Sequence, residues 1–357
     1  MALVPLRDHI FFLAQLQNLG YLAVYFTALA VRFRAGRVTR PMLSIDKRPL
    51  AVVGACEAVA QLLFMAGAAH IPGPLLPVVN QTYLVWSLLF ASLILGTRYS
   101  RAQLAGAALV VAGVSAAAIP PAALAQWLPQ TAGSAAAAAA AAVSNAAAAA
   151  EVELRYVAVC VSCFAFPAIA NCIKERVFSS AAATLGRPLD IFVVNSFGSL
   201  FQAVFVLLLL PATTAIKGLA LSDLPSHMAA SLRAFLGEAG ATAGVAGGWM
   251  QYSTPLLALS YVVTNLAFNI SILSLLRSVG SVTTTLVGSS LVPLTIAAFT
   301  LPLPYLEPAM LGPNFLLGAA LLMAGLATYN WESWRWLLRG LRNPQPRNSS
   351  GGEASAG

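Results

Sequence analysis

The octapeptide GAALVVAG at residues 106–113 recurs near the other end of the chain as GAALLMAG at residues 318–325, with six of the eight positions identical. Small residues are common in membrane helices because they let backbones approach closely, so chance is the alternative explanation. However, the segments before the two copies also align loosely, with Tyr83-Leu84-Val85 against Leu291-Val292-Pro293. The spacing therefore favours an internal repeat.

Outward from these copies, most of the chain consists of apolar stretches of about the ~20 residues that a helix needs to cross a bilayer. We predict nine spans, at residues 10–33, 51–69, 75–95, 103–119, 154–173, 190–210, 255–276, 282–301 and 314–331. The composition, 59% hydrophobic and 9% charged, is far from that of a soluble domain. The sequence thus predicts an all-α membrane protein.

The basic residues orient these spans. If the end of the first span faces inside, 16 of the 20 lysines and arginines lie in inside segments, and only Arg7, Arg155, Lys217 and Arg233 lie outside. This bias is the one that membrane insertion favours. It also accounts for the net charge of +8, which is therefore no sign of nucleic-acid binding. Counting the alanine-rich stretch 135–150 as a tenth span would divide the basic residues 11 to 9, so we assign 120–153 to a Pro/Ala-rich linker.

This organisation predicts a bundle of two inverted repeats. The first repeat covers 1–119 with four helices, the second covers 154–337 with five, and 338–357 forms a disordered tail. An odd number of helices per repeat gives inverted topology, a common plan of secondary transporters. The first repeat is one helix short of five. Because the first eight residues lack the features of a signal peptide, we expect the missing first helix and any targeting segment to lie upstream.

Several stretches resemble the plant thiol-transporter branch of the chloroquine-resistance-transporter-like family, within the drug/metabolite transporter superfamily. They are ALVPL (2–6), FFLAQ (11–15), RFRAG (32–36), PGP (72–74), NQTYLVW (80–86), IKE (173–175), DIFVVNSFGS (190–199) and NLAFNIS (265–271). The resemblance implies ten helices in two inverted repeats, of which the first is absent here. It also implies a plastid envelope carrier for glutathione and γ-glutamylcysteine, whereas the drug-resistance branch is associated with proton-coupled export of cations and peptides.

Glu57 is the one acidic residue that falls well inside a predicted span. A carboxylate in hydrocarbon is costly unless it is protonated, paired or facing water, so we expect Glu57 to face the interior of the bundle. Gln61 follows one turn later on the same face. Proton coupling or contact with a substrate amine is the functional interpretation, and a neutral carboxyl that packs against a neighbouring helix is the alternative.

Amides and hydroxyls form polar stripes on several other spans. The candidate substrate-binding or coupling residues on these stripes are Asn80, Gln81, Tyr83, Asn195, Ser199, Gln202, Asn265 and Asn269, with Asn18, Tyr21 and Tyr25 forming a similar stripe in the first span. Any single stripe serves equally well as contact between helices. Together they suit a cavity that binds a polar solute by hydrogen bonds.

Lys174 and Arg176 close the fifth predicted span, where they could attract an anionic substrate at the mouth of the cavity. The alternative is that they anchor the helix end at the inner surface, with Glu175 pairing locally. Cys160 and Cys163 have the C-x2-C spacing, but buried thiols that pack as small apolar groups explain them better than a metal site does.

The sequence thus favours a secondary transporter of thiol peptides over two other classes of protein. Coupling of this transport to protons is part of the hypothesis. Another drug/metabolite carrier, for amino acids, peptides or organic cations, is the first alternative; a sugar-phosphate carrier fits less well because the last two spans hold no cation before Arg335. A non-transporting membrane assembly protein is the second. We expect no enzyme activity, catalytic residue, cofactor or metal. The expected partners are a small solute and membrane lipid, with the chain a monomer or homodimer.

Overall fold

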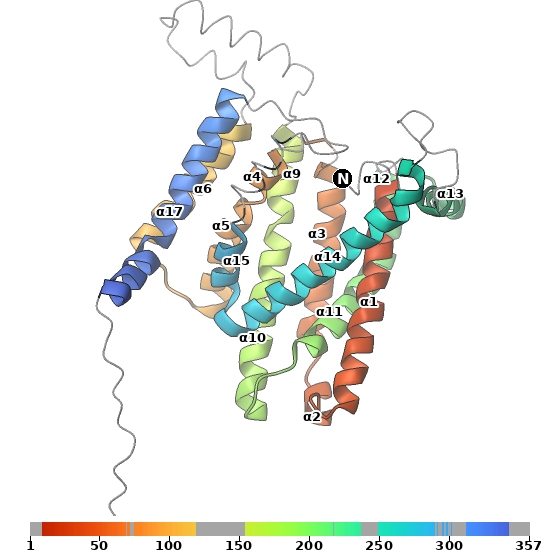
Figure 1. The fold of residues 1–357 in the computed structure, drawn as a ribbon, viewed down its shortest axis with the longest axis horizontal. Helices are drawn as coiled ribbons and strands as arrows, with labels where there is room; N and C mark the ends of the chain where they lie inside the picture. Colours follow the sequence, from red (N-terminus) through yellow and green to blue (C-terminus); the bar gives the residue numbers. More distant parts are fainter. Residues whose placement is uncertain are drawn as a thin grey trace, which may run out of the picture.

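The computed structural model describes residues 9–68, 70–71, 75–118, 154–216, 218–236, 249–289, 291, 295, 298, 301 and 312–342. Every regular element within these ranges is a helix, and none of them is a strand (Figure 1). Five helical segments are long and apolar enough to cross a membrane: Arg48–Ala68, Leu75–Leu95, Leu154–Leu185, Ile191–Leu208 and Ala258–Val279. Arg101–Ala117 and Phe315–Trp331 are shorter apolar helices. The chain is therefore an all-helical membrane protein.

The first half of the chain contains α1 to α6. The elements are α1 (Ile10–Arg34), α2 (Arg40–Leu43), α3 (Arg48–Ala68), α4 (Leu75–Val79), α5 (Thr82–Phe90), the π-helical turn η2 (Ala91–Leu95) and α6 (Arg101–Ala118). The predicted span 75–95 thus has the expected ends but is broken at Asn80 and Gln81. At the break the backbone N–H of Gln81 donates to Val78 O at 3.0 Å, three residues back instead of four, and Gln81 Nε2 and Thr82 Oγ1 donate to Pro77 O and Val79 O at 3.2 and 2.8 Å.

The second half contains α9 to α17. The elements are α9 (Leu154–Cys163), α10 (Ala165–Leu185), α11 (Ile191–Leu208), α12 (Leu210–Ile216), the 3-10 turn η3 (Leu221–Asp223), α13 (Leu224–Leu236), α14 (Trp249–Val279), α15 (Ser281–Ser289) and α17 (Pro313–Arg342). The proposed linker 120–153 and most of the tail lie outside the described residues.

Three helices continue beyond the bounds predicted for their spans. The fifth span does not end at Ile173, because α10 continues to Leu185 and the apolar segment reaches 32 residues. α14 begins at Trp249 and carries Pro255 inside it, so this helix begins before the predicted seventh span, whereas its segment apolar enough to cross a membrane begins at Ala258. α17 continues to Arg342, into the segment predicted to be a tail. Of the eighth span, the structure describes a helix only as far as Ser289.

The helices α3 and α10 lie side by side and organise the bundle. α3 packs against α9, α10 and α11, while α10 also packs against α5, α14 and α15. The ends of α1 and α10 and the short α2 lie at the lower edge of Figure 1, so the basic segments around Arg40 and Arg187 share one side of the bundle. Glu57 and Lys174 lie between α3 and α10, well away from the helix ends.

The two copies of the octapeptide pack directly against each other through their glycines. A Cβ atom on Gly106 would lie 2.7 Å from Gly325 O, and a Cβ atom on Gly113 would lie 2.7 Å from Gly318 O. The first glycine of each copy therefore meets the last glycine of the other, so α6 and α17 run antiparallel. A contact in which each position of one copy meets the reciprocal position of the other is the signature of two-fold symmetry.

We predict that Gly318→Ala destabilises the protein by about 1–3 kcal/mol, the usual cost of forcing extra atoms into a packed contact. Its Cβ atom would lie 2.5 Å from Gly113 O and 2.6 Å from Ala117 Cβ, so α6 and α17 would have to separate. Thermal unfolding in detergent measures the effect. Gly198→Ala in α11 is the control, because the nearest atom to its Cβ lies 3.9 Å away. Equal unfolding temperatures for the two variants would contradict the prediction.

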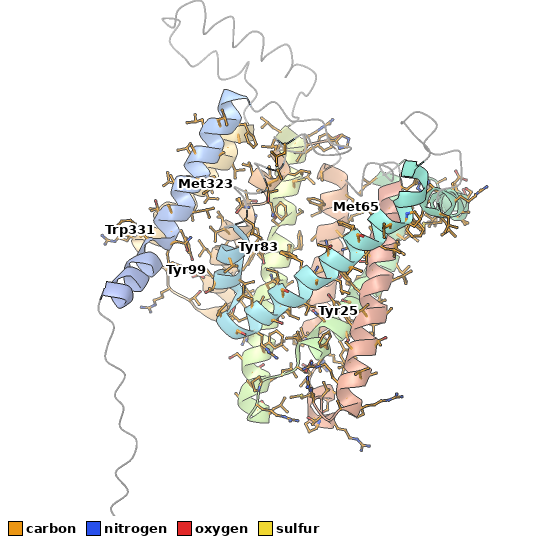
Figure 2. The ribbon with its side chains drawn as sticks, viewed as in Figure 1. Tyr25, Met65, Tyr83, Tyr99, Met323 and Trp331 are labelled. Carbon is orange, nitrogen blue, oxygen red and sulfur yellow. The ribbon has the colours of Figure 1, made fainter. Side chains whose placement is uncertain are left out.

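Large apolar side chains cover the outer surface of the bundle. Trp331 projects from α17 at the left edge of Figure 2 and is 56% exposed. Leu93, Leu208, Leu256 and Val263 are also more than half exposed. Exposed apolar side chains of this kind are suited to contact with lipid hydrocarbon.

Candidate solute-binding site

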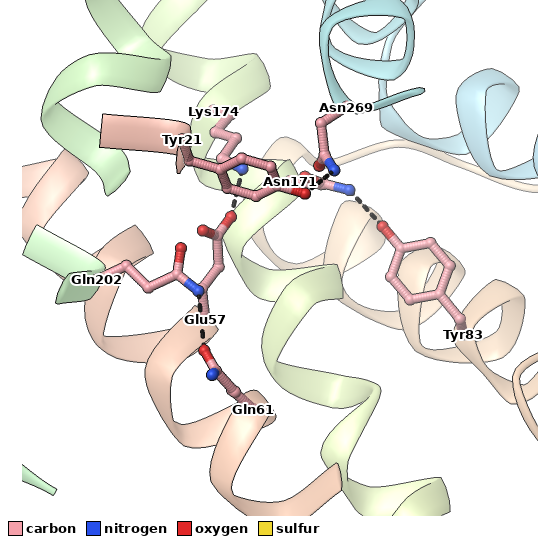
Figure 3. A network of polar contacts seen from close by, with 8 residues as sticks. All are labelled: Tyr21, Glu57, Gln61, Tyr83, Asn171, Lys174, Gln202 and Asn269. Carbon is pink, nitrogen blue, oxygen red and sulfur yellow. Dashed lines mark hydrogen bonds and ion pairs between the residues drawn. The ribbon is translucent and has the colours of Figure 1, made fainter. Parts of the chain in front are cut away.

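Glu57 and Lys174 form an ion pair between α3 and α10. Lys174 Nζ donates directly to Glu57 Oε1, and the two side chains are 13% and 23% exposed (Figure 3). Glu57 is therefore neutralised by a cation from another helix. Lys174 was expected at the end of its helix, at the mouth of the cavity. Instead it lies in the middle of α10, which continues eleven residues further to Leu185.

The neighbours of Lys174 lie elsewhere. Arg176 is exposed and lies outside this pair. Glu175 does not pair locally, since its Oε2 accepts a 2.6 Å hydrogen bond from the backbone N–H of Ser281. A carboxylate at the first turn of α15 is favoured by the helix dipole. The close approach requires Gly280, which has a φ of +84° and no Cβ atom to meet Glu175. Residues 174 and 175 thus join α10 to α3 on one side and to α15 on the other.

Three amide side chains continue the polar surface outward from Glu57. Gln61 Oε1 accepts from Gln202 Nε2 at 3.4 Å and from Asn18 Nδ2 at 3.5 Å. Gln61 lies one turn from Glu57 on α3, while Gln202 comes from α11 and Asn18 from α1. The polar stripes predicted on these three helices therefore meet. The other two candidates on α11 do not join this contact: Asn195 Nδ2 is buried without a hydrogen-bond partner in the described part of the chain, and Ser199 is half-buried.

Tyr21 joins α1 to α14 through two asparagines. Its hydroxyl donates to Asn265 Oδ1, and Asn269 Nδ2 donates to Tyr21 Oη at 2.8 Å and to Asn265 Oδ1 at 2.8 Å. The i, i+4 spacing of Asn265 and Asn269 places both amides on the face of α14 that meets α1.

A cavity of about 320 Å³ lies between α5, α10, α14 and α15. It is lined by Asn80, Gln81, Tyr83, Phe164, Pro167, Asn171, Phe268, Ile272, Thr284, Thr285 and Gly288. Three of the predicted residues, Asn80, Gln81 and Tyr83, are among them because the break between α4 and α5 falls at this cavity. Asn171 Nδ2 donates to the Tyr83 hydroxyl (Figure 3). This lining has many polar groups and no charged side chain.

Gln81 has an unsatisfied acceptor at this cavity. Its side chain is 4% exposed, its Nε2 donates to Pro77 O, and its Oε1 has no hydrogen-bond partner among the described residues. An unpaired buried acceptor costs about 1–3 kcal/mol. A solute that donates a hydrogen bond to Gln81 Oε1 would recover part of that cost.

Asn171 connects the cavity to the ion pair, and sequence reasoning missed it. Asn171 and Lys174 are three residues apart on α10 and share one face. Figure 3 shows Asn171 between Lys174 and Tyr83. Thr284 and Thr285, 3% and 6% exposed, were also missed. The signal that could have found Asn171 is its i, i+3 spacing from a lysine in an apolar helix.

A second ion pair holds the C-terminal end of α1 and the N-terminal end of α11 together. Arg32 Nε and Nη2 both lie 2.7 Å from Asp190 Oδ2. Asp190 is 5% exposed and caps α11, because its Oδ1 accepts from the N–H of Phe192 at 2.9 Å. Arg277 Nη1 donates to Leu189 O at 3.3 Å and adds α14 to the same contact. The ends of these three helices are thereby joined.

We predict that Asp190→Asn lowers the stability by about 2 kcal/mol, the scale of a hydrogen bond to a charged group. The asparagine keeps the cap on α11 but removes the negative charge that Arg32 contacts. Thermal unfolding in detergent checks this. Asp223→Asn is the matched control, because Asp223 is exposed and its carboxylate accepts from the neighbouring Ser222. The prediction fails if both variants unfold like the parent chain.

Metal-binding residues do not gather in the part of the chain that the structure describes: no three His, Cys, Asp or Glu side chains there are placed to hold an ion. Cys160 and Cys163 are buried, and Cys160 Sγ packs against Gly67. The chemistry available at the candidate site is therefore that of hydrogen bonds and one ion pair.

Comparison with known proteins gives a consistent result. Residues 1–329 match the sequence model of the CRT-like, chloroquine-resistance transporter-like, family. The chain is 41% identical over 332 residues to "Protein CLT2, chloroplastic" of Arabidopsis thaliana, covering 92% of this chain and 71% of that protein. It is 36% identical over 333 residues to "Protein CLT3, chloroplastic" of the same plant, covering 93% and 68%. "Crt homolog 3" of Dictyostelium discoideum is 22% identical over 371 residues, covering 97% and 70%.

Proposed function

The chain belongs to the chloroquine-resistance-transporter-like family, and on that basis we propose that it is a secondary transporter of small thiol peptides, glutathione and γ-glutamylcysteine. The family resemblance noted in the sequence is confirmed. The chain is a multi-pass membrane protein, and its plant relatives are named chloroplastic, so it is placed in a plastid membrane. The envelope is the plastid membrane that we propose for it.

One observation supports a carrier above the others: polar side chains meet inside an apolar bundle. Glu57 and Lys174 connect α3 to α10 in the middle of the membrane-spanning helices, and the cavity beside them is lined by amides and hydroxyls together with apolar side chains. Intramembrane charges are costly and mark solute or ion pathways in membrane proteins. An assembly protein would have no need of such an interior.

The architecture that we propose for transport is two inverted repeats. The antiparallel packing of α6 on α17 through matched glycines supports such a relation between the first and second halves. In carriers of this kind the solute site lies near the middle of the membrane, between the repeats, and broken helices contribute to it. Glu57 and Lys174 come from different halves, and the break between α4 and α5 lies at the cavity.

Proton coupling through Glu57 is the second part of the proposal. A carboxyl group that can be paired with Lys174, or protonated and released from it, has two states that a proton gradient can select. Sugar phosphates fit the interior less well, since the last two predicted spans hold no cation before Arg335. Amino acids, other peptides and organic cations remain the competing solutes for the same site.

Uptake by purified protein in liposomes tests the proposal. Radiolabelled glutathione is offered with and without a pH gradient across the membrane, and unlabelled γ-glutamylcysteine or a sugar phosphate is added as competitor. We expect saturable uptake that responds to the gradient and is reduced by γ-glutamylcysteine alone. Uptake no faster than into protein-free liposomes would end the proposal.

A further inference from the structure

Glu57 and Lys174 hold one negative and one positive charge in direct contact, and both side chains remain partly accessible. They keep 23% and 13% of their surface exposed, respectively. Since the contact joins α3 to α10, a solute that passes between these helices meets both charges at once. The pair is therefore placed to take part in recognition, in addition to any role in coupling.

The charge balance of the pair decides which solutes it can accept. A solute with a single charge would take one partner and leave the other buried without a counter-charge, which is strongly unfavourable. A solute that carries an ammonium and a carboxylate on the same carbon can place the ammonium at Glu57 and the carboxylate at Lys174. Glu57 and Lys174 then each keep a counter-charge, so a solute with a compact zwitterionic end can replace the internal contact without a large penalty at the pair.

The adjacent cavity adds a second requirement. Asn171, one turn before Lys174, lines this cavity together with Gln81, whose buried Oε1 has no partner among the described residues. A peptide amide supplies the missing N–H donor for Gln81 and a carbonyl for the amide groups nearby. The volume of about 320 Å³ lies at the lower end of the range for small-molecule sites.

We propose that the site recognises γ-linked peptides: the Glu57–Lys174 pair takes the amino-acid end of the solute, and the cavity at Asn171 and Gln81 takes the first peptide amide. This inference rests on the proposed function and specifies its substrate class. A γ-glutamyl peptide keeps its α-ammonium and α-carboxylate on one carbon, because the chain continues through the side-chain carboxyl. In the α-linked isomer that carboxylate forms the peptide bond, and the nearest free carboxylate lies at the end of the glutamate side chain, two methylene groups beyond the carbon that carries the ammonium.

A competition experiment with matched isomers tests the inference. Uptake of radiolabelled glutathione is measured against unlabelled glutathione, its α-linked isomer Glu-Cys-Gly, glutathione acetylated on the α-amine, and glutathione esterified on the glycine carboxyl. We expect the α-linked and acetylated peptides to compete at least about tenfold more weakly than glutathione, the scale of one lost charged hydrogen bond. The glycine ester should compete at least as well as glutathione, because the cavity lining has no cation to pair with the glycine carboxylate. Equal competition by the α-linked or the acetylated peptide would overturn the inference.

A charge exchange provides the test in the protein itself. The double variant Glu57→Lys with Lys174→Glu keeps an ion pair but reverses its direction relative to the cavity, so the preference for the γ-linked isomer should disappear. A double variant that keeps the tenfold preference would contradict the inference. If this variant does not fold, the competition experiment with the peptide isomers on the parent chain is the test of the inference.

The outcomes separate this inference from the proposed function. If the parent chain takes up glutathione but does not distinguish the isomers, only the inference fails. If the parent chain takes up no glutathione, the proposed function fails, and the inference is then decided by ligand-induced thermal stabilisation of the detergent-purified chain. Greater stabilisation by the γ-linked isomer than by the α-linked isomer would support it, and equal stabilisation would overturn it.

Discussion

Glu57→Gln is expected to lower the initial rate of glutathione uptake by at least about tenfold and to leave a residual rate that does not change with pH. Glutamine keeps the size and hydrogen-bonding capacity of Glu57 but cannot gain or lose a proton, and it removes the charge that Lys174 contacts. Uptake into liposomes measured between about pH 5.5 and about pH 8, without a gradient and with one, gives the profile. The tenfold figure corresponds to the loss of one hydrogen bond to a charged group.

Glu57→Asp is the control for this prediction. Aspartate is one methylene shorter, so its contact with Lys174 is weakened, yet it retains a group that titrates. We expect slower uptake that still depends on pH. If Glu57→Gln transports like the parent chain across the same range, Glu57 is a packing residue and the hydrogen-bonding groups alone handle the solute.

Lys174→Met is expected to destabilise the protein by about 3 kcal/mol at neutral pH, the lower end of the range for breaking a buried ion pair, since Glu57 remains partly exposed. The variant leaves the Glu57 carboxylate in an apolar setting without a counter-charge. The loss should be smaller at acidic pH, because a protonated carboxyl needs no cation. Thermal unfolding in detergent across the same pH range measures both effects.

Combining Lys174→Met with Glu57→Gln separates stability from transport. Removing both charges leaves neither side chain unpaired, so the double variant should recover most of the lost stability. It should not recover uptake, because neither charge remains to meet the solute. Recovery of uptake together with stability would show that the pair only holds α3 and α10 together.

The sequence predicted the class of fold because the evidence for it is local. Hydropathy, helix length and the family resemblance identify a helical membrane protein of this family without knowledge of any contact. The ends of the helices were harder to predict from the sequence. Lys174, Glu175 and Arg176 marked a membrane border in the sequence, yet α10 continues through them because two of the three charges are compensated by α3 and α15.

The candidate site was predictable only in its components. Polar stripes on single helices indicated which faces turn inward, and the structure brings Gln61, Gln202 and Asn18 together as one contact. The pairing of Glu57 with Lys174 was missed because the two residues are 117 positions apart and no local pattern links them. Asn171 has a local signal in its i, i+3 spacing from Lys174, but its partner Tyr83 lies on another helix and could not be predicted from that spacing.

The central claim, that a peptide binds beside α10 in the cavity lined by Ile272, is tested most directly by protection of a cysteine. Ile272→Cys is made on a background without the four native cysteines, and its reaction with a thiol reagent is followed with and without S-methylglutathione, which has no free thiol to consume the reagent. The account predicts that the peptide slows labelling at the concentrations that inhibit uptake, while labelling of Ser278→Cys, at the exposed end of α14, is unchanged. Inhibition of uptake with unchanged labelling at position 272 would contradict it.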